Sequence, residues 1–248
     1  MAFHNLQSMI NWMKTSDTAH WIDTSESTTD CPPGLEYLAE INQLTVCHRF
    51  DLEVLCYLEA NKTYEVMNNQ GHRIYVVEEQ SNWFLRYLCG LARPFTMTIY
   101  DNTGQVVITV HKGLGGSCCC CIRCHSCCPQ KLIVEAPPGK TIGYVHQKFH
   151  PIWPNLKIKN QKKEDVMKIK GPCLVSGCLR NLNFNILSVG DERVIGNISK
   201  LCPGFVKGLL SDADSFKIQF PYDLDVKIKA LMLGASLFID YMYFELCP

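Results

Sequence analysis

The stretch ALMLGASLFIDYMYF, Ala230 to Phe244, decides how the rest of the chain is interpreted. It is apolar nearly all round and, apart from Gly234, lacks turn-forming residues, which is typical of a helix without a polar face. A helix of this length rises only about 22 Å, whereas the hydrocarbon layer of a bilayer is about 30 Å thick. This length, together with the charged Asp240, favours a helix buried in a protein core over a membrane span.

A single membrane span is the alternative for the same residues. Lys227 and Lys229 precede the stretch and only the segment 245–248 follows it. That distribution satisfies the positive-inside rule for a helix whose C-terminus crosses the membrane. The sequence therefore predicts a helix at 230–244 and leaves two environments for it, of which the core is preferred.

Before this helix the chain repeats one pattern, in which a β-rich run, a turn signal and another β-rich run follow one another. Five hairpins are predicted with turns at Asn69–Gly71, Asp101–Gly104, Pro137–Gly139, Gln161–Lys163 and Gly190–Asp191. With LTVCHRFDLEVLCYL before them and FKIQFP after them, the count is about twelve short strands. Short connections exclude parallel crossovers, so an antiparallel barrel or sandwich is expected. A barrel of this size needs a filling, which the apolar helix would supply.

Composition predicts one domain and no strong global field. Residues 1–30 are polar and aperiodic and are expected to be a disordered tail, whereas 31–248 form the β domain. Lys+Arg 24 against Asp+Glu 24 leaves a formal charge of zero, so the sequence carries no strong nucleic-acid signal and any such contact must be local. No secretory signal opens the chain, and Ala2 excludes N-myristoylation, which predicts a cytosolic start.

The chain holds 15 cysteines, and a dense group of them lies in SCCCCIRCHSCCPQ, Ser117 to Gln130. The CxxC spacing suits a zinc or iron–sulfur site, but metal sites usually draw ligands from separated segments. Disulfides between adjacent cysteines are strained, and a reducing compartment disfavours them. Acylation needs only exposed thiols near a membrane, and several chains anchor stably where one does not. A chemically inert cysteine-rich loop is the remaining alternative.

The segment DADSFKIQFPYD, Asp212 to Asp223, partly matches a calcium-binding EF-hand loop. Aspartates occupy loop positions 1, 3 and 12, but Lys217 stands where the turn requires glycine and the last ligand is Asp rather than Glu. From the residues alone, a strand with an acidic lead-in is the better interpretation. No GxSxG, phosphate-binding glycine loop or HExxH motif is present, so no enzyme activity is predicted.

Several of these stretches together resemble the phospholipid scramblase family, from Pro32 to Glu245. The motifs that carry the resemblance are PPGLEYL from Pro32, RPFTMTIYDNTGQVVITV from Arg93, APPGKTIGYV from Ala136, KEDVMKIKGPC from Lys163, and DADSFKIQFPYDLDVKIKALMLGASLFIDYMYFE from Asp212. The chain is identified as a short-tailed member. The resemblance implies a tubby-like fold, a twelve-stranded antiparallel barrel enclosing a C-terminal hydrophobic helix, which agrees with the strand count.

The resemblance also implies a function and two sets of site residues. The function is calcium-dependent, ATP-independent movement of phospholipids between leaflets, without covalent catalysis, by a palmitoylated protein at the cytoplasmic face of the plasma membrane. The implied calcium ligands are Asp212, Asp214, Phe216, Ile218, Phe220 and Asp223. The implied palmitoylation sites are Cys118, Cys119, Cys120, Cys121, Cys124, Cys127 and Cys128.

The chain departs from the family pattern in three places. The family's CCCPCC core is spread out here as CCCCIRCHSCC. The proline-rich tail that binds SH3 and WW domains in some members is absent, so those partners are not implied. The family's basic nuclear-import segment corresponds to Gly196–Phe205, where Lys200 is the only basic residue, so import is not implied. Expected partners are a phospholipid membrane, signalling proteins and a second copy. The alternative function is a lipid-anchored β-barrel signalling adaptor that binds lipids or proteins without transport.

Overall fold

The computed structural model describes residues 31–49, 62–81, 84, 93–113, 129–148, 150, 153–172, 182–201 and 215–244. The predicted tail, residues 1–30, lies outside this part of the chain. The elements, in chain order, are α2 (Glu36–Ala39), β1 (Gln43–Arg49), β2 (Thr63–Met67), β3 (Arg73–Gln80), β4 (Phe95–Tyr100), β5 (Val106–Lys112), β6 (Lys131–Glu135), β7 (Thr141–Gln147), β8 (Asn155–Asn160), β9 (Asp165–Lys170), β10 (Asn183–Ser188), β11 (Val194–Leu201), β12 (Ser215–Gln219) and α4 (Val226–Tyr243).

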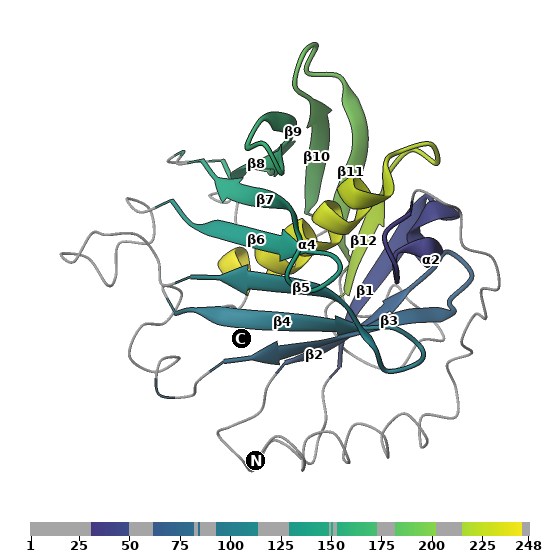
Figure 1. Ribbon diagram of the computed structural model, residues 1–248. Helices are drawn as coiled ribbons and strands as arrows, with labels where there is room; N and C mark the ends of the chain where they lie inside the picture. Colours follow the sequence, from purple (N-terminus) through teal and green to yellow (C-terminus); the bar gives the residue numbers. More distant parts are fainter. Residues whose placement is uncertain are drawn as a thin grey trace.

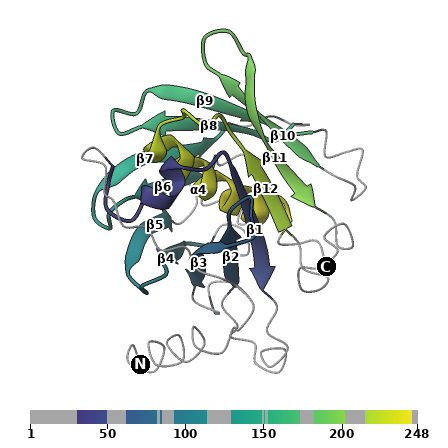
Figure 2. The same ribbon diagram turned by 90° about the vertical axis from the view of Figure 1, so that its right-hand side faces the viewer.

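The strands form one closed antiparallel barrel in which each strand pairs with its neighbours in the sequence. The barrel closes between the first and last strands, where Leu44 of β1 lies opposite Ile218 of β12. Figure 1 shows the strands arranged around α4, and Figure 2 shows the same arrangement after a quarter turn. The predicted mainly-β fold, a twelve-stranded antiparallel barrel around a C-terminal helix, is confirmed.

The hairpin turns lie where the sequence predicts them, and local side chains explain the β4–β5 turn. The Asp101 carboxylate accepts hydrogen bonds from the backbone N–H groups of Thr103 at 2.8 Å and Gln105 at 2.9 Å. Gly104 has a φ of +80°, a conformation that a residue with a Cβ rarely adopts. This turn chemistry fixes the register of the two strands.

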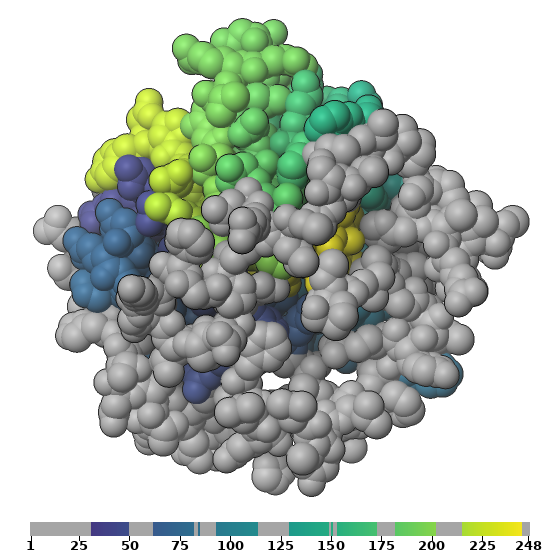
Figure 3. Space-filling view, turned by 180° about the vertical axis from the view of Figure 1, so that it is seen from behind, coloured from purple at the N-terminus to yellow at the C-terminus, as the bar shows by residue number. Residues whose placement is uncertain are grey.

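The β10–β11 hairpin projects furthest from the body and stands at the top of the view in Figure 3.

Helix α4 fills the barrel. Its residues from Lys229 to Met242 are all buried. The Tyr241 ring packs on Phe95 of β4 with ring centroids 4.5 Å apart. At Gly234 an added Cβ would lie only 3.0 Å from the Val134 side chain of β6, so the helix approaches the strands closely there. Of the two predicted environments for this helix, the structure has the core.

The helix begins four residues earlier than the apolar stretch predicts, at Val226 rather than Ala230. Asp225 caps it, because its carboxylate accepts hydrogen bonds from the backbone N–H groups of Lys227 at 2.8 Å and Ile228 at 3.3 Å. Prediction from hydrophobicity missed the first turn because that turn contains two lysines. Among the described residues, no helix has the length and apolar character that crossing a membrane requires.

Candidate functional site

The predicted calcium segment becomes a strand and a turn. Phe216 and Ile218 lie in β12 with buried side chains, and Phe220 follows β12, also buried. Asp223 is exposed in the turn before α4. Asp212 and Asp214 lie outside the described residues. The part of the segment that the structure describes therefore forms barrel wall and the connection to the central helix.

The described ligands of this set do not converge on one point. β12 pairs with β1 on one side and β11 on the other, so it is extended and its carbonyl groups face two neighbouring strands. Phe216 and Phe220 are four residues apart, which is about 13 Å at the rise of a strand. Calcium ligands lie about 2.3 to 2.6 Å from the ion. These residues do not fit a single EF-hand-type coordination sphere in this conformation.

No other grouping of metal-ligating side chains replaces it in the described ranges. Within them, no three His, Cys, Asp or Glu residues come together in a way that could hold a metal ion. The described residues at this end of the barrel therefore form the barrel wall and the turn before α4, and their side chains do not form a metal site.

The turn before α4 is held by a buried lysine. The Lys229 ammonium, with three N–H donors, lies within hydrogen-bond distance of four backbone carbonyl oxygens: Leu38 at 2.9 Å, Ala39 at 3.3 Å, Ile41 at 2.8 Å and Tyr222 at 2.9 Å. Burial lowers the pKa of Lys229, and the nearby Asp223 carboxylate opposes this shift. The lysine joins the start of α4 to the end of α2 and to the segment after β12, which fixes this end of the helix.

A second set of buried polar contacts holds the other end of α4. The Tyr64 hydroxyl of β2 donates to the Asp240 carboxylate at 2.8 Å. The Arg93 guanidinium pairs with Glu79 at 2.7 Å, and both side chains are buried. The backbone carbonyl of Arg93 accepts from the Lys112 ammonium at 2.8 Å and from the Tyr241 hydroxyl of α4 at 3.4 Å. Asp240, the charged residue that made a membrane span unfavourable in the sequence analysis, is thus hydrogen-bonded inside the barrel.

The predicted palmitoylation sites, Cys118 to Cys128, lie outside the described residues. In the sequence they stand between β5 and β6, two neighbouring strands of the barrel. Cys47 of β1 is described, and it makes a useful contrast. Burial, with a smaller contribution from Glu65, raises the pKa of the Cys47 thiol to about 11. A thiol with this pKa is protonated at neutral pH and is a poor nucleophile.

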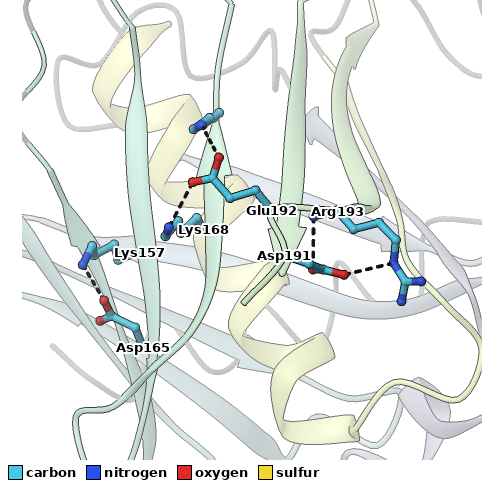
Figure 4. Close-up of polar contacts among 7 residues, drawn as sticks. Lys157, Asp165, Lys168, Asp191, Glu192 and Arg193 are labelled. Atoms are coloured by element: carbon cyan, nitrogen blue, oxygen red, sulfur yellow. Dashed lines mark hydrogen bonds and ion pairs between the residues drawn. The ribbon is translucent and has the colours of Figure 1, made fainter. Parts of the chain in front are cut away.

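The outer surface carries a set of ion pairs over β8, β9 and the β10–β11 hairpin, shown in Figure 4. The Asp165 carboxylate is bound by the ammonium groups of both Lys157 and Lys159. These contacts lower the pKa of Asp165 to about 2. Glu192 in the hairpin likewise lies between two lysines, at 3.2 Å from Lys168 and 3.3 Å from Lys170. Each carboxylate is therefore shared by two positive charges.

A shallow hollow adjoins these ion pairs. It has a volume of about 260 Å³ and is lined by His150, Trp153, Asn155, Lys170 and Gly171. The Trp153 side chain is 46% exposed. The exposed Trp153 ring therefore lines the same hollow as Lys170, one of these lysines.

Prediction from sequence missed these lysines as a group. The runs NLKIKN and DVMKIK alternate lysine with Leu, Ile or Met, which places the lysines on the outer face of each strand. That signal is visible in the sequence. Which lysines lie beside one another depends on the pairing of strands, which the sequence pattern does not give.

Comparisons with known proteins agree with the resemblance noted in the sequence. The family model described as Scramblase matches residues 23–246. Phospholipid scramblase 2 from Homo sapiens is 46% identical over 226 residues, which cover 91% of this chain and 75% of that protein. Phospholipid scramblase 1 from Mus musculus is 46% identical over 91% of this chain and 68% of its own length. Phospholipid scramblase family member 5 from Homo sapiens is 41% identical over 88% and 79%.

One solved structure, an X-ray structure of a protein from Arabidopsis thaliana, aligns over 85% of this chain and 99% of its own length. Its TM-score is 0.44 at 10% sequence identity. The family model and the sequence relatives span nearly the whole barrel domain, from before α2 to the end of α4. This chain belongs to the phospholipid scramblase family.

Proposed function

We propose that this protein moves phospholipids between the two leaflets of a membrane, in response to calcium and without ATP or covalent catalysis. It acts as a palmitoylated protein at the cytoplasmic face of the plasma membrane. The observation that carries the proposal is the identity of 46% over 91% of the chain with a protein named phospholipid scramblase 2.

Leaflet exchange is tested by reconstitution. The purified full-length chain is inserted into liposomes that carry a fluorescent phospholipid in both leaflets, and a membrane-impermeant quencher is added. Without exchange, about half of the fluorescence is protected in the inner leaflet. With calcium, scrambling exposes the inner pool and the protected fraction falls toward zero, whereas with a chelator it stays near half. Protection that is equal in both conditions, and equal to that of protein-free liposomes, contradicts the proposal.

Calcium dependence needs its own measurement, because the described part of β12 does not supply a coordination sphere. Isothermal titration with CaCl₂ compares the wild-type chain with an Asp212→Asn, Asp214→Asn variant. A matched control carries Asp101→Asn, a change in the β4–β5 turn. Calcium binding that is lost only in the first variant supports the acidic segment as the site. Equal binding in all three chains removes that part of the proposal and leaves leaflet exchange to be judged separately.

Palmitoylation is tested on the cysteine-rich segment. Metabolic labelling with an acyl probe, followed by hydroxylamine, reports thioester-linked chains. We expect hydroxylamine-sensitive label in the wild type and in Cys47→Ser, and none when Cys118 to Cys128 are replaced by alanine. Label that persists in the alanine variant contradicts the assignment.

The lipid-anchored adaptor is the second candidate, and the enclosed helix favours it. Eight apolar side chains larger than alanine are buried on α4: Leu231, Met232, Leu233, Leu237, Phe238, Ile239, Tyr241 and Met242. At about 1.5 to 3 kcal/mol each, their exposure to water costs about 12 to 24 kcal/mol. That is as large as the stability of a whole domain. A helix held this firmly offers no path for headgroups. If vesicle binding persists without leaflet exchange at realistic protein densities, the adaptor is the better assignment.

A further inference from the structure

The barrel carries a row of basic side chains in register on its outer surface. Lys131 of β6 lies opposite His146 of β7, His146 lies opposite Lys157 of β8, and Lys157 lies opposite Lys168 of β9. Neighbouring strands are about 4.8 Å apart, so this row crosses four strands within about 15 Å. Like charges directly opposite each other destabilise a sheet. For the pair Lys157 and Lys168 this repulsion is offset by Asp165, which contacts Lys157, and by Glu192, which contacts Lys168.

The local charge around this row is positive even though the whole chain is neutral. We call the outward-facing residues Lys131, His146, Lys157, Lys159, Lys168 and Lys170 the lysine face. Two carboxylates, Asp165 and Glu192, contact its lysines. Five lysines minus two carboxylates leave three positive charges. The Lys131 ammonium lies instead over the Tyr144 ring, 4.4 Å from its centroid.

The titration of His146 agrees with this positive field. Burial is the largest cause of the lowered pKa of His146, and the charges of Lys131 and Lys159 lower this pKa further. The opposite wall of the barrel differs, because β2 and β3 bring Glu65 and Glu78 into partly exposed positions. On that wall Arg49 and Arg73 both contact Glu65, so the cations of β1 and β3 lie against a carboxylate.

Exposed apolar side chains flank the lysine face. Trp153, 46% exposed, precedes β8 and shares the hollow with Lys170. Val194, 56% exposed, begins β11 two residues after Glu192. Tryptophan is enriched at the headgroup level of membranes, and clusters of lysine bind anionic lipid surfaces. The combination of a basic row with exposed apolar residues beside it suits the headgroup region of a bilayer, where ammonium groups contact phosphates and apolar side chains reach the lipid.

In the sequence, the cysteine-rich segment comes shortly before β6. Cys128 stands three residues before Lys131, the first residue of β6 and the start of the basic row. One acyl chain gives only reversible membrane binding, and an acyl chain with a basic patch gives stable anchoring. Chains on this segment and the lysine face would therefore act on the same membrane.

We propose that the lysine face docks the barrel on an anionic phospholipid bilayer, with its ammonium groups among the headgroup phosphates and carboxylates and Trp153 at the headgroup level. This rests on the membrane association in the proposed function, but it does not require leaflet exchange. It gives the barrel a fixed orientation, with the outer surface of β6 to β9 facing the lipid.

The test measures binding of the full-length chain, treated with hydroxylamine to remove thioester-linked acyl chains, to sedimented vesicles. Vesicles of phosphatidylcholine with about 30% phosphatidylserine are compared with pure phosphatidylcholine. The variant Lys157→Gln, Lys168→Gln removes two charges yet leaves Asp165 with Lys159 and Glu192 with Lys170. Each lysine near an anionic surface contributes about fivefold, so the partition coefficient should fall about 25-fold.

The matched control is Lys62→Gln, Lys217→Gln, which removes the same charge near β2 and on β12. It should change binding less than about threefold, since its lysines lie away from the proposed contact. Glu192→Gln should change vesicle binding in the opposite direction. It removes the carboxylate that contacts Lys168 and Lys170, so binding to anionic vesicles should rise about fivefold. A purely structural role for Glu192 would not increase membrane affinity.

Three outcomes overturn the proposal. The wild type does not bind the anionic vesicles more than the neutral ones; or both lysine variants lose binding equally; or the chain binds a DNA duplex at equal phosphate concentration and does not bind the vesicles. Leaflet exchange is scored separately. A chain that docks through this face but exchanges no lipid contradicts the proposed transport function and leaves the docking surface standing.

Discussion

The lysine inside this barrel and the lysines on its outer surface differ in burial and in the groups that contact them. Inside, Lys229 has four carbonyl oxygens around one ammonium group and is 0% exposed. Outside, Lys168 and Lys170 share a single carboxylate, Glu192, and their side chains are 25% and 47% exposed. The buried charge has its hydrogen bonds supplied by the fold, whereas the outer charges remain in contact with solvent.

This difference assigns a structural role to the buried lysine and a binding role to the outer lysines. A buried ammonium is tolerated only when fixed groups replace its water, so Lys229 holds α4 in one position. Exposed lysines that share carboxylates contribute little to stability and keep a positive field outside the barrel. Perturbing the inside should therefore change folding, and perturbing the outside should change binding.

Replacing Lys229 by methionine should give the largest effect. The change removes the ammonium group from the carbonyl groups of Leu38 and Ile41, whose contacts with it are buried, and breaking a buried charged contact costs about 3 to 5 kcal/mol. For a domain of this size the melting temperature should fall by about 10 °C. Urea denaturation followed by circular dichroism measures the change.

The control for this variant is Lys227→Met, two residues away on the same helix and partly exposed. It removes the same charge and should change the free energy of unfolding by less than about 0.5 kcal/mol. If both variants are equally stable, the four carbonyl contacts do not hold the helix, and the contrast between inner and outer lysines is lost.

Replacing Trp153 by alanine should weaken vesicle binding without affecting folding. The ring is 46% exposed, so its removal takes little from the core but removes apolar area that would contact the headgroup region. We expect three- to tenfold weaker binding to anionic vesicles and an unchanged melting temperature. The control is Tyr222→Ala, an aromatic residue that is 62% exposed in the turn before α4. If both changes weaken vesicle binding equally, Trp153 does not contact the membrane more than another exposed aromatic residue does.

The inner and outer groups also differ in how far the sequence predicts them. The hairpins and the apolar helix follow from turn residues such as Gly104 and from composition, which act locally. The site of Lys229 does not, because its acceptors Leu38 and Ile41 lie nearly two hundred residues away in the sequence. The first turn of α4 was missed for the same reason, since a lysine there reads as polar until its partners are known.

The lysine face shows a different limit of sequence analysis. The alternation of lysine with apolar residues in β8 and β9 predicts an outward-facing charge on each strand. The row itself depends on the register between four strands, and a shift of one residue would move every lysine to the other face. For the segment Asp212 to Asp223 the residues favour a strand with an acidic lead-in, and its described part is indeed a strand that pairs with β1 and β11. The calcium ligands implied by the family resemblance stay a prediction.

The smallest expected effect concerns Asp165, whose pKa reports the field of the lysine face. Lys157 and Lys159 hold this pKa at about 2, below its ordinary value of 3.8. A carboxylate with a lowered pKa in the folded state contributes stability above about pH 4 that is lost as pH falls toward 2. Asp165→Asn should therefore destabilise the protein at pH 7 by less than about 1 kcal/mol, as exposed ion pairs do, and the difference from wild type should disappear near pH 2.

The same carboxylate sharpens the contrast between the two groups of lysines. In a Lys157→Gln variant, the pKa of Asp165 measured by NMR titration should rise toward 3.8, because one of its two ammonium partners is gone. In Lys229→Met it should stay near 2, since the buried lysine acts inside the barrel and contacts only backbone carbonyls. A pKa of Asp165 that does not move in Lys157→Gln would mean that the lysines do not create the local field. The proposed attraction of anionic lipid to this face would then lose its electrostatic basis.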